Sequence, residues 1–264
     1  MSSLQGAHAL ITGGGSGIGL ACAVAMAEDG ARVTIVGRNE DKLAAALAGP
    51  LAGLTAAALP CDVASEEQVA DVVRQANEAA PLTIAVANAG IGGLSHFTNT
   101  SEAEWRGVLQ TNLDGTFYTF KHAGAAIREA GGGAMCAISS IAGLRTHRFM
   151  SAYCVSKAGI DMLVRNCADE LGAHGVRVNS VCPGLVDTEI AAGLFATDAV
   201  HEDYLDCMPL RRTGDVGDIG RAVRFLCGPE STWITGVNLP VDGGHHLRRG
   251  PNLDVFASML DNPS

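Results

Sequence analysis

Short apolar segments and longer amphipathic segments alternate along most of the chain. The apolar segments are rich in Ala, Val, Leu and Ile and have the length of buried strands; they cover residues 8–12, 32–36, 54–59, 82–87, 134–139, 176–181 and 237–241. Helical spacing of apolar positions recurs in residues 18–29, 40–47, 66–79, 102–110, 113–129, 152–173 and 216–227. This alternation predicts a parallel sheet covered by helices on both faces.

The fold class expected from this pattern is α/β, a three-layer, doubly wound arrangement around a mainly parallel sheet of seven strands. The chain contains no linker, internal repeat or low-complexity tract, so we expect a single domain over residues 1–264. Its core would span about residues 6–244, with a lid at about residues 188–210. Residues 245–264 fall outside the alternation and form a tail, which is either disordered or packed on a neighbouring subunit.

Composition narrows the class of protein. Hydrophobic residues make up 47% of the 264 residues and charged residues 17%, which is enough apolar material for a large core. The net charge of −10 argues against a partner that is nucleic acid or an anionic membrane surface. Because no apolar run is long enough to cross a bilayer and no signal-peptide pattern begins the chain, we expect a cytoplasmic location.

The eight cysteines form no Cys-x-x-Cys pair, and most of them lie inside apolar segments. Free cysteines of this kind are usually buried, reduced and used as small hydrophobic residues. A zinc site needs clustered ligands, and the sequence shows no such cluster. We therefore expect reduced thiols and no metal.

A glycine-rich turn joins the first predicted strand to the first predicted helix and reads Thr-Gly-Gly-Gly-Ser-Gly-Ile-Gly over residues 12–19. Glycine clusters also occur in structural turns, but the position between a strand and a helix favours phosphate binding. Glycine lets the backbone approach a pyrophosphate closely, and the helix N-terminus offers N–H groups and a partial positive charge. The predicted dinucleotide contacts here are Gly13, Gly15, Ser16, Gly17, Ile18 and Gly19.

The end of the second strand indicates which dinucleotide is bound. NAD-binding units usually carry an acidic residue there, which accepts hydrogen bonds from the ribose hydroxyls. This chain has Gly37 and Arg38 instead, and an arginine can pair with the 2′-phosphate of NADP. We therefore expect NADP, with NAD as the alternative if Arg38 only stacks on adenine.

Two further strand ends offer residues to the same ligand. Asp62 and Val63 follow the third strand, where Asp62 either accepts a hydrogen bond from adenine or serves as a turn residue. Asn88, Ala89 and Gly90 follow the fourth strand. Because ligands bind at the carboxyl ends of strands in open α/β sheets, these residues are expected to line the cofactor site.

A proton-transfer group is expected at the same edge of the sheet. Tyr153 and Lys157 are four residues apart near the start of a predicted helix, so both lie on one helix face. A nearby cation lowers the pKa of a phenol, and Tyr153 would then exchange a proton with an alcohol or carbonyl near neutral pH. Ser140 would donate a hydrogen bond to the substrate oxygen, whereas Ser139 is expected to point away or bond locally.

Together these motifs resemble those of the short-chain dehydrogenase/reductase family, in its shorter branch. The resemblance covers about residues 6–244 and rests on the glycine-rich turn, Asn88-Ala89-Gly90, Asn112, Ser140, Tyr153-x-x-x-Lys157, Pro183-Gly184 and Thr188. It implies a Rossmann fold and an oxidoreductase that transfers hydride between a nicotinamide cofactor and a carbonyl or secondary alcohol.

The resemblance also implies roles for individual residues. Ser140, Tyr153 and Lys157 would be catalytic, and Lys157 would also hold the nicotinamide ribose. Asn112 would hold a water that links Lys157 to solvent, or would only satisfy backbone groups at a helix bend. The nicotinamide side would be lined by Pro183, Gly184, Val186 and Thr188.

The family further implies a homotetramer, with the helices after Asn112 and Ser151 and the last strand at its interfaces. A catalytically inactive dinucleotide-binding regulator or scaffold is the alternative function. Such a protein would be favoured by the loss of Tyr153 or Lys157, and this chain has both.

The substrate side offers two features. The segment around Arg145, His147 and Arg148 is unusually basic for an acidic protein, and its charges are either solvated or bind an acyl-CoA or carboxylate substrate. Residues 191–206 would form the substrate lid. Its apolar residues, which either line the substrate site or belong to the core, are Leu194, Phe195, Tyr204 and Met208.

Overall fold

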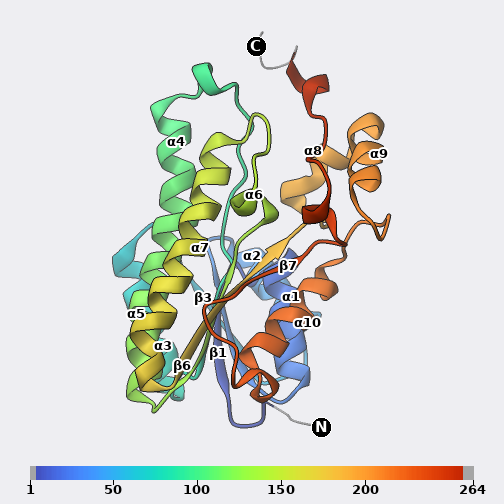
Figure 1. The fold of residues 1–264 in the computed structure, drawn as a ribbon. Helices are drawn as coiled ribbons and strands as arrows, with labels where there is room; N and C mark the ends of the chain where they lie inside the picture. The colour runs from blue at the N-terminus through green and yellow to red at the C-terminus, as the bar shows by residue number, and fades with distance from the viewer. Residues whose placement is uncertain (1–3, 258–264) are drawn as a thin grey trace.

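One parallel sheet forms the centre of the computed structural model, which describes residues 4–257 (Figure 1). The strands run in the order β3-β2-β1-β4-β5-β6-β7, and every pairing is parallel. The order reverses between β1 and β4, and a crevice at the carboxyl ends of the strands is expected at such a point. The strands are β1 (His8–Thr12), β2 (Arg32–Gly37), β3 (Ala56–Pro60), β4 (Ile84–Ala87), β5 (Gly133–Ile138), β6 (Val176–Pro183) and β7 (Asn238–Val241).

Helices cover both faces of this sheet, so the predicted doubly wound α/β fold is confirmed (Figure 1). One face carries α1 (Gly17–Glu28), α2 (Glu40–Ala48) and α10 (Val216–Cys227). The other face carries α3 (Glu66–Ala79), α4 (Glu102–Leu109), α5 (Gly115–Glu129) and α7 (Ser151–Leu171). Further helices lie toward the carboxyl ends of the strands: α6 (Ile141–Leu144), α8 (Ala192–Phe195) and α9 (Asp198–Cys207).

Each face of the sheet has its own apolar core. Consecutive residues of β1 show how one strand serves both, because Ile11 packs with α1 and α10 while Leu10 packs with α3, α5 and α7. Both side chains are fully buried, and each such burial stabilises the fold by about 1.5–3 kcal/mol. Double-sided burial explains why the strands are continuously apolar rather than alternating.

The cysteines belong to these cores. All eight are free thiols, and Cys154 and Cys167 are half-buried whereas the other six are buried. The predicted reduced, buried thiols are therefore confirmed. Burial raises the pKa of Cys61 to about 11 and that of Cys182 to about 12, which keeps both thiols protonated at neutral pH.

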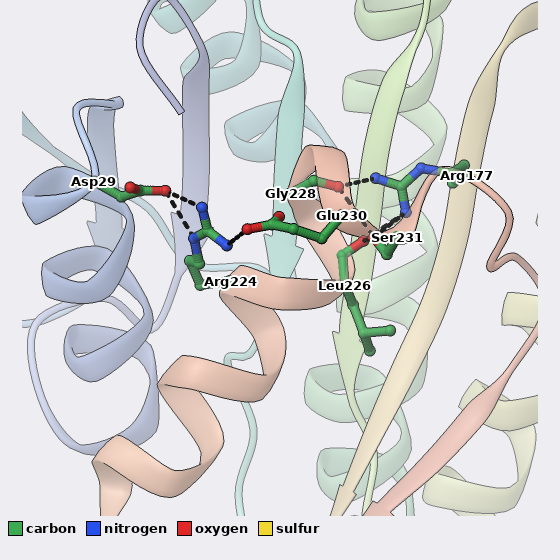
Figure 2. A network of polar contacts seen from close by, with 7 residues as sticks. All are labelled: Asp29, Arg177, Arg224, Leu226, Gly228, Glu230 and Ser231. Carbon is green, nitrogen blue, oxygen red and sulfur yellow. Dashed lines mark hydrogen bonds and ion pairs between the residues drawn. The ribbon is translucent and has the colours of Figure 1, made fainter. Parts of the chain in front are cut away.

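Two arginines hold the last helix in place at the end of the sheet opposite the carboxyl ends (Figure 2). Arg224 of α10 forms ion pairs with Asp29, which follows α1, and with Glu230. Arg177 at the start of β6 donates to the Ser231 hydroxyl at 2.9 Å and to backbone carbonyls at the end of α10. This network ties α10 to both its neighbouring helix and its strand.

A π-helical turn at residues Gln110–Asp114 joins α4 to α5, where the sequence pattern predicted two separate helices. Asn112 lies in this turn, fully buried, and its side-chain oxygen accepts from the Ile91 N–H at 2.8 Å. Its amide nitrogen donates to the Ile91 carbonyl at 3.0 Å and to the Ser156 hydroxyl at 3.1 Å. Such turns are often found at functional sites, and this one fixes the loop after β4 to α7.

The lid and the tail form a third apolar cluster above the sheet. Tyr204 and Met208 from the lid pack there with Leu253 and Phe256 from the tail. The Asp203 carboxylate accepts from Arg249 at 2.7 Å, which ties α9 to the tail. The expectation for the tail is therefore corrected up to residue 257, because it packs on its own chain; residues 258–264 lie outside the described residues.

The basic segment holds this tail. Both terminal nitrogens of Arg145 donate to the His245 carbonyl at 3.1 Å, and Arg148 pairs with Asp254. The two arginines of the segment are therefore paired within the chain rather than simply solvated. Recognition of an acyl-CoA or carboxylate substrate by this segment stays a prediction. Across residues 4–257, no helix is long and apolar enough to cross a membrane.

Candidate active site

A cleft of about 780 Å³ opens at the carboxyl ends of the strands. The glycine-rich turn forms one part of its wall and the lid forms another. Most of the predicted site residues line it, although they come from distant parts of the chain. These are Gly13, Gly15, Ser16, Gly17, Ile18, Arg38, Asn88, Ala89, Gly90, Ser140, Tyr153, Lys157, Pro183, Gly184, Val186 and Thr188.

Four predicted residues do not line the cleft. Gly19 is a packing glycine, because a Cβ there would lie 2.3 Å from the Gly13 carbonyl oxygen. Asp62 accepts from the Ala64 N–H at 3.0 Å and so acts as a turn residue. Val63 is buried in the core, and Asn112 is committed to the loop after β4. Any contact of these four with a cofactor stays a prediction.

The glycine-rich turn has the geometry that a phosphate site needs. Gly13 and Gly17 adopt φ values of 64° and 54°, which are strained for residues with a Cβ. Ser16 precedes α1 but makes no capping hydrogen bond, and the first turn of α1 holds no acidic residue. The N-terminus of α1 therefore keeps its partial positive charge available to an anion.

Asn88 fixes this turn to the centre of the sheet. Its side chain donates to the Thr12 carbonyl at 2.9 Å. The Thr12 hydroxyl in turn accepts from the backbone N–H groups of Asn88 at 2.9 Å and Ala89 at 3.0 Å. The ends of β1 and β4 are thereby held together on either side of the switch in strand order.

The end of the cleft beside the carboxyl end of β2 carries two basic residues. Arg38 is exposed there, and Lys42 lies one helical turn further on in the same wall. Lys42 pairs across the cleft with Glu189, at Nζ–O distances of 2.6 and 2.8 Å. Among the described residues of the lining, Glu189 is the single carboxylate, so the end of β2 has no acidic partner for ribose hydroxyls.

The proton-transfer residues meet at the middle of the cleft. The Lys157 ammonium lies 5.5 Å from the centre of the Tyr153 ring and donates to the Ile138 carbonyl at 2.8 Å. Tyr153 hydrogen-bonds to Ser140, whose hydroxyl also caps the short helix α6. The Ser139 hydroxyl donates to the Lys157 carbonyl at 3.2 Å, which confirms that it bonds locally.

Burial controls the titration of this pair. It raises the pKa of Tyr153, against the opposing effect of the Ser140 hydrogen bond. It lowers the pKa of Lys157 to about 8, against the attraction of Asp161. The net shift of the Tyr153 pKa is upward, because desolvation of the phenol is the largest effect. A lowering of this pKa by Lys157 together with a bound nicotinamide stays a prediction.

Asp161 is a residue that the sequence reasoning missed. It lies four residues after Lys157 on the same helix face and is only 2% exposed. Its carboxylate accepts from the Asn238 amide at 2.8 Å and from the Ser180 hydroxyl at 3.2 Å. Tyr153, Lys157 and Asp161 follow one another at a spacing of four residues, which places all three on one helix face. This spacing could have indicated an acidic group beside Lys157.

Only some of the lid residues that were expected to line the substrate site do so. Tyr204 and Leu194 line the cleft as predicted, but Phe195 and Met208 are not among its lining residues, and Met208 is fully buried. Phe256 of the tail also lines the cleft, which no sequence pattern indicated. The described residues contain no group of three or more His, Cys, Asp or Glu side chains that could hold a metal ion.

The lowered pKa of Lys157 predicts how stability depends on pH. In the unfolded chain the lysine keeps its proton up to about its ordinary value of 10.5, whereas in the folded protein it loses the proton near 8. Between these values the unfolded state binds more protons, so the free energy of unfolding rises with pH. We expect wild type to gain on the order of 2 kcal/mol relative to Lys157→Met between pH 8 and 10.5.

Urea denaturation of both proteins at a series of pH values measures this difference. Other groups titrate in the same range but do so in both proteins, so they cancel in the comparison. Parallel stability curves for the two proteins would show that burial does not destabilise the charged form of Lys157.

Comparisons with known proteins agree with this geometry. Residues 13–246 match the family model described as enoyl-(acyl carrier protein) reductase. Galactitol 2-dehydrogenase (L-tagatose-forming) of Cereibacter sphaeroides is 37% identical over 244 residues, which are 92% of this chain and 96% of the relative.

The fold is also similar to solved structures of dehydrogenases. A short-chain type dehydrogenase/reductase from Mycobacterium ulcerans superposes with a TM-score of 0.93 at 39% identity, covering 98% of this chain and 95% of the other. A gluconate 5-dehydrogenase from Burkholderia cenocepacia, solved in complex with NADP and tartrate, has a TM-score of 0.89 at 30% identity, covering 94% and 98%.

Proposed function

Since the chain belongs to the short-chain dehydrogenase/reductase family, we propose that it interconverts a ketone and a secondary alcohol with NADP, using Tyr153 as general acid and base. Membership makes it an NAD(P)-dependent oxidoreductase of alcohols and ketones. The observation that carries the finer proposal is the convergence of Ser140, Tyr153 and Lys157 on the cleft that the glycine-rich turn lines. Nothing in that arrangement favours an inactive scaffold.

The residues of the cleft fit a dinucleotide. A Cβ at Gly13 would lie 2.7 Å from the Asn88 side-chain nitrogen, so glycine is needed there for the close packing and the positive φ that give the turn its shape. Arg38 at the other end supports NADP, because a guanidinium can pair with a 2′-phosphate in a bidentate manner. We propose that Lys157 and Thr188 hold the nicotinamide half, with Pro183 and Gly184 behind it.

The nicotinamide supplies or accepts the hydride when it is bound. Ser140 donates a hydrogen bond to the substrate oxygen, which stabilises the negative charge that develops on a reduced carbonyl. Tyr153 gives its proton to that oxygen in reduction and takes it back in oxidation. Lys157 lies close enough to the Tyr153 ring to favour the phenolate that results.

A panel of ketones and secondary alcohols, each assayed with both cofactors, tests this function directly. We expect NADPH to be consumed with at least one class of ketone, and more efficiently than NADH. Absence of turnover with every carbonyl and alcohol, by a protein that binds NADPH, would favour the scaffold alternative.

We further propose that the chain forms a homotetramer. Val155 and Met162 of α7 are 47% and 51% exposed, and Phe117 of α5 is 44% exposed, so apolar side chains lie open on these two helices. Trp233, which precedes β7, is 99% exposed. Apolar residues in such positions are typical of interfaces between subunits.

The proposed tetramer has one interface at α5 and α7 and another at β7. Disrupting the first is expected to give a dimer. The double change Phe117→Glu and Met162→Glu places charges on α5 and α7 while leaving the β7 side intact. Light scattering coupled to size-exclusion chromatography should find a tetramer for wild type and a dimer for the double variant. A monomeric wild type would contradict the proposal.

A further inference from the structure

The substrate end of the cleft holds two polar side chains on a mostly apolar wall. Met150, Leu194 and Phe256 provide the apolar part of this wall. His147 and Tyr204 also line the cleft, and they are only 8% and 3% exposed. Buried polar groups are normally hydrogen-bonded, so these two side chains need partners.

The His147 ring lacks one of its partners. Its Nδ1 atom is buried without any hydrogen bond. Behind it lies the His245 ring, 6.4 Å away between centres, which is fully buried and does not line the cleft. Burial lowers the pKa of His147 and outweighs an opposing interaction with the Arg145 backbone, so the imidazole is neutral at physiological pH.

Tyr204 brings a hydroxyl to the same place from the lid. Its ring packs edge-on against His245 at 5.6 Å, and its hydroxyl hydrogen-bonds to no other described residue. A charge on Tyr153 would raise the pKa of Tyr204, so the two phenols lie within electrostatic reach of each other. The unpartnered groups are thus adjacent to the proposed reacting centre.

We propose that His147 and Tyr204 form a subsite for a second, uncharged oxygen of the substrate, a hydroxyl or carbonyl close to the reacting carbon. The substrate class is then hydroxyketones and the corresponding diols. This inference rests on the proposed function, because it names what the ketone or alcohol carries beyond its reacting group.

An uncharged oxygen fits the site better than a carboxylate. Arg145 acts electrostatically on both His147 and Tyr204, but both of its terminal nitrogens donate to the His245 carbonyl, and it is not among the lining residues. A carboxylate would therefore be buried beside a neutral imidazole and a phenol, without an ion-pair partner. Nε2 is the ring nitrogen of His147 that is not buried, and it hydrogen-bonds to no other described residue, so a hydroxyl can hydrogen-bond to it and accept from Tyr204.

The test compares 2-hydroxycyclohexanone with cyclohexanone, which differ by one hydroxyl. With NADPH, wild type is expected to have a kcat/KM at least about tenfold higher for the hydroxyketone, because an unmade hydrogen bond leaves buried groups unpaired. Tyr204→Phe and His147→Leu should each lose at least about fivefold more kcat/KM on 2-hydroxycyclohexanone than on cyclohexanone. Tyr118→Phe and His174→Leu make the same chemical changes far from the cleft and should alter neither value.

Binding separates failure of the subsite from failure of the proposed function. Calorimetry with trans-1,2-cyclohexanediol and cyclohexanol on protein saturated with NADPH measures binding alone, because an alcohol cannot react with the reduced cofactor. Tighter binding of the diol by wild type, lost in Tyr204→Phe and His147→Leu, supports the subsite even if no ketone is reduced. Equal preference in wild type and both variants, or a preference for cyclohexanecarboxylate over the diol, overturns it.

Discussion

Replacement of Tyr153 by Phe should lower kcat for ketone reduction by at least about 100-fold, the usual contribution of a general acid. The change removes only the hydroxyl that bonds to Ser140 and keeps the ring beside Lys157. Since burial raises the pKa of Tyr153, its hydroxyl holds the proton at neutral pH and can act as the general acid in reduction. Steady-state assays with NADPH and a ketone turned over by wild type measure the loss.

The affinity for NADPH should be unchanged in this variant, which fluorescence titration can verify. Tyr118→Phe removes a hydroxyl from a partly buried tyrosine packed against the α5 side of the core and serves as the matched control. Turnover by Tyr153→Phe close to that of the control would remove Tyr153 from the mechanism.

Loss of the Arg38 side chain should weaken NADPH binding by about 10- to 150-fold and leave NADH binding almost unaffected. A hydrogen bond to a charged group contributes about 1.5–3 kcal/mol, which corresponds to that range. Arg38 is exposed at the cleft margin, and the Lys42 ammonium nearby is already paired with Glu189. Most of the discrimination between the cofactors should therefore depend on the guanidinium.

Arg32→Ala provides the control, since Arg32 is an exposed arginine at the opposite end of the same strand. Dissociation constants for NADPH and NADH with wild type, Arg38→Ala and Arg32→Ala complete the comparison. If both cofactors lose affinity equally in Arg38→Ala, the arginine stacks on adenine and does not bind the 2′-phosphate.

Local patterns in the sequence predict most of the fold and many of the site residues. Strand boundaries were predicted to within about two residues, because burial on both faces leaves an unmistakable apolar run, as in β1. The residues at strand ends could be placed on one rim because parallel strands share their carboxyl edge. For this reason the sequence predicts that Asn88, Ser140 and the glycine-rich turn converge at one edge of the sheet, as they do in the cleft.

Other features depend on contacts that no local pattern encodes. The titration of Tyr153 follows from how deeply it is buried, which its spacing from Lys157 does not reveal. The π-helical turn at Asn112 exists because that side chain bonds to Ile91, which is distant in sequence. The tail was misjudged because its partners, Arg145 and Asp203, looked like ordinary surface charges.

The fold of the tail has a practical consequence for anyone who produces this protein. Phe256 belongs both to the tail and to the wall of the cleft, so peptide fused after residue 257 begins close to the place where substrate enters. The described residues begin beside the end of α1, at the opposite end of the sheet (Figure 1). A peptide attached on that side therefore starts far from the cleft, whereas one attached directly after residue 257 starts beside its wall.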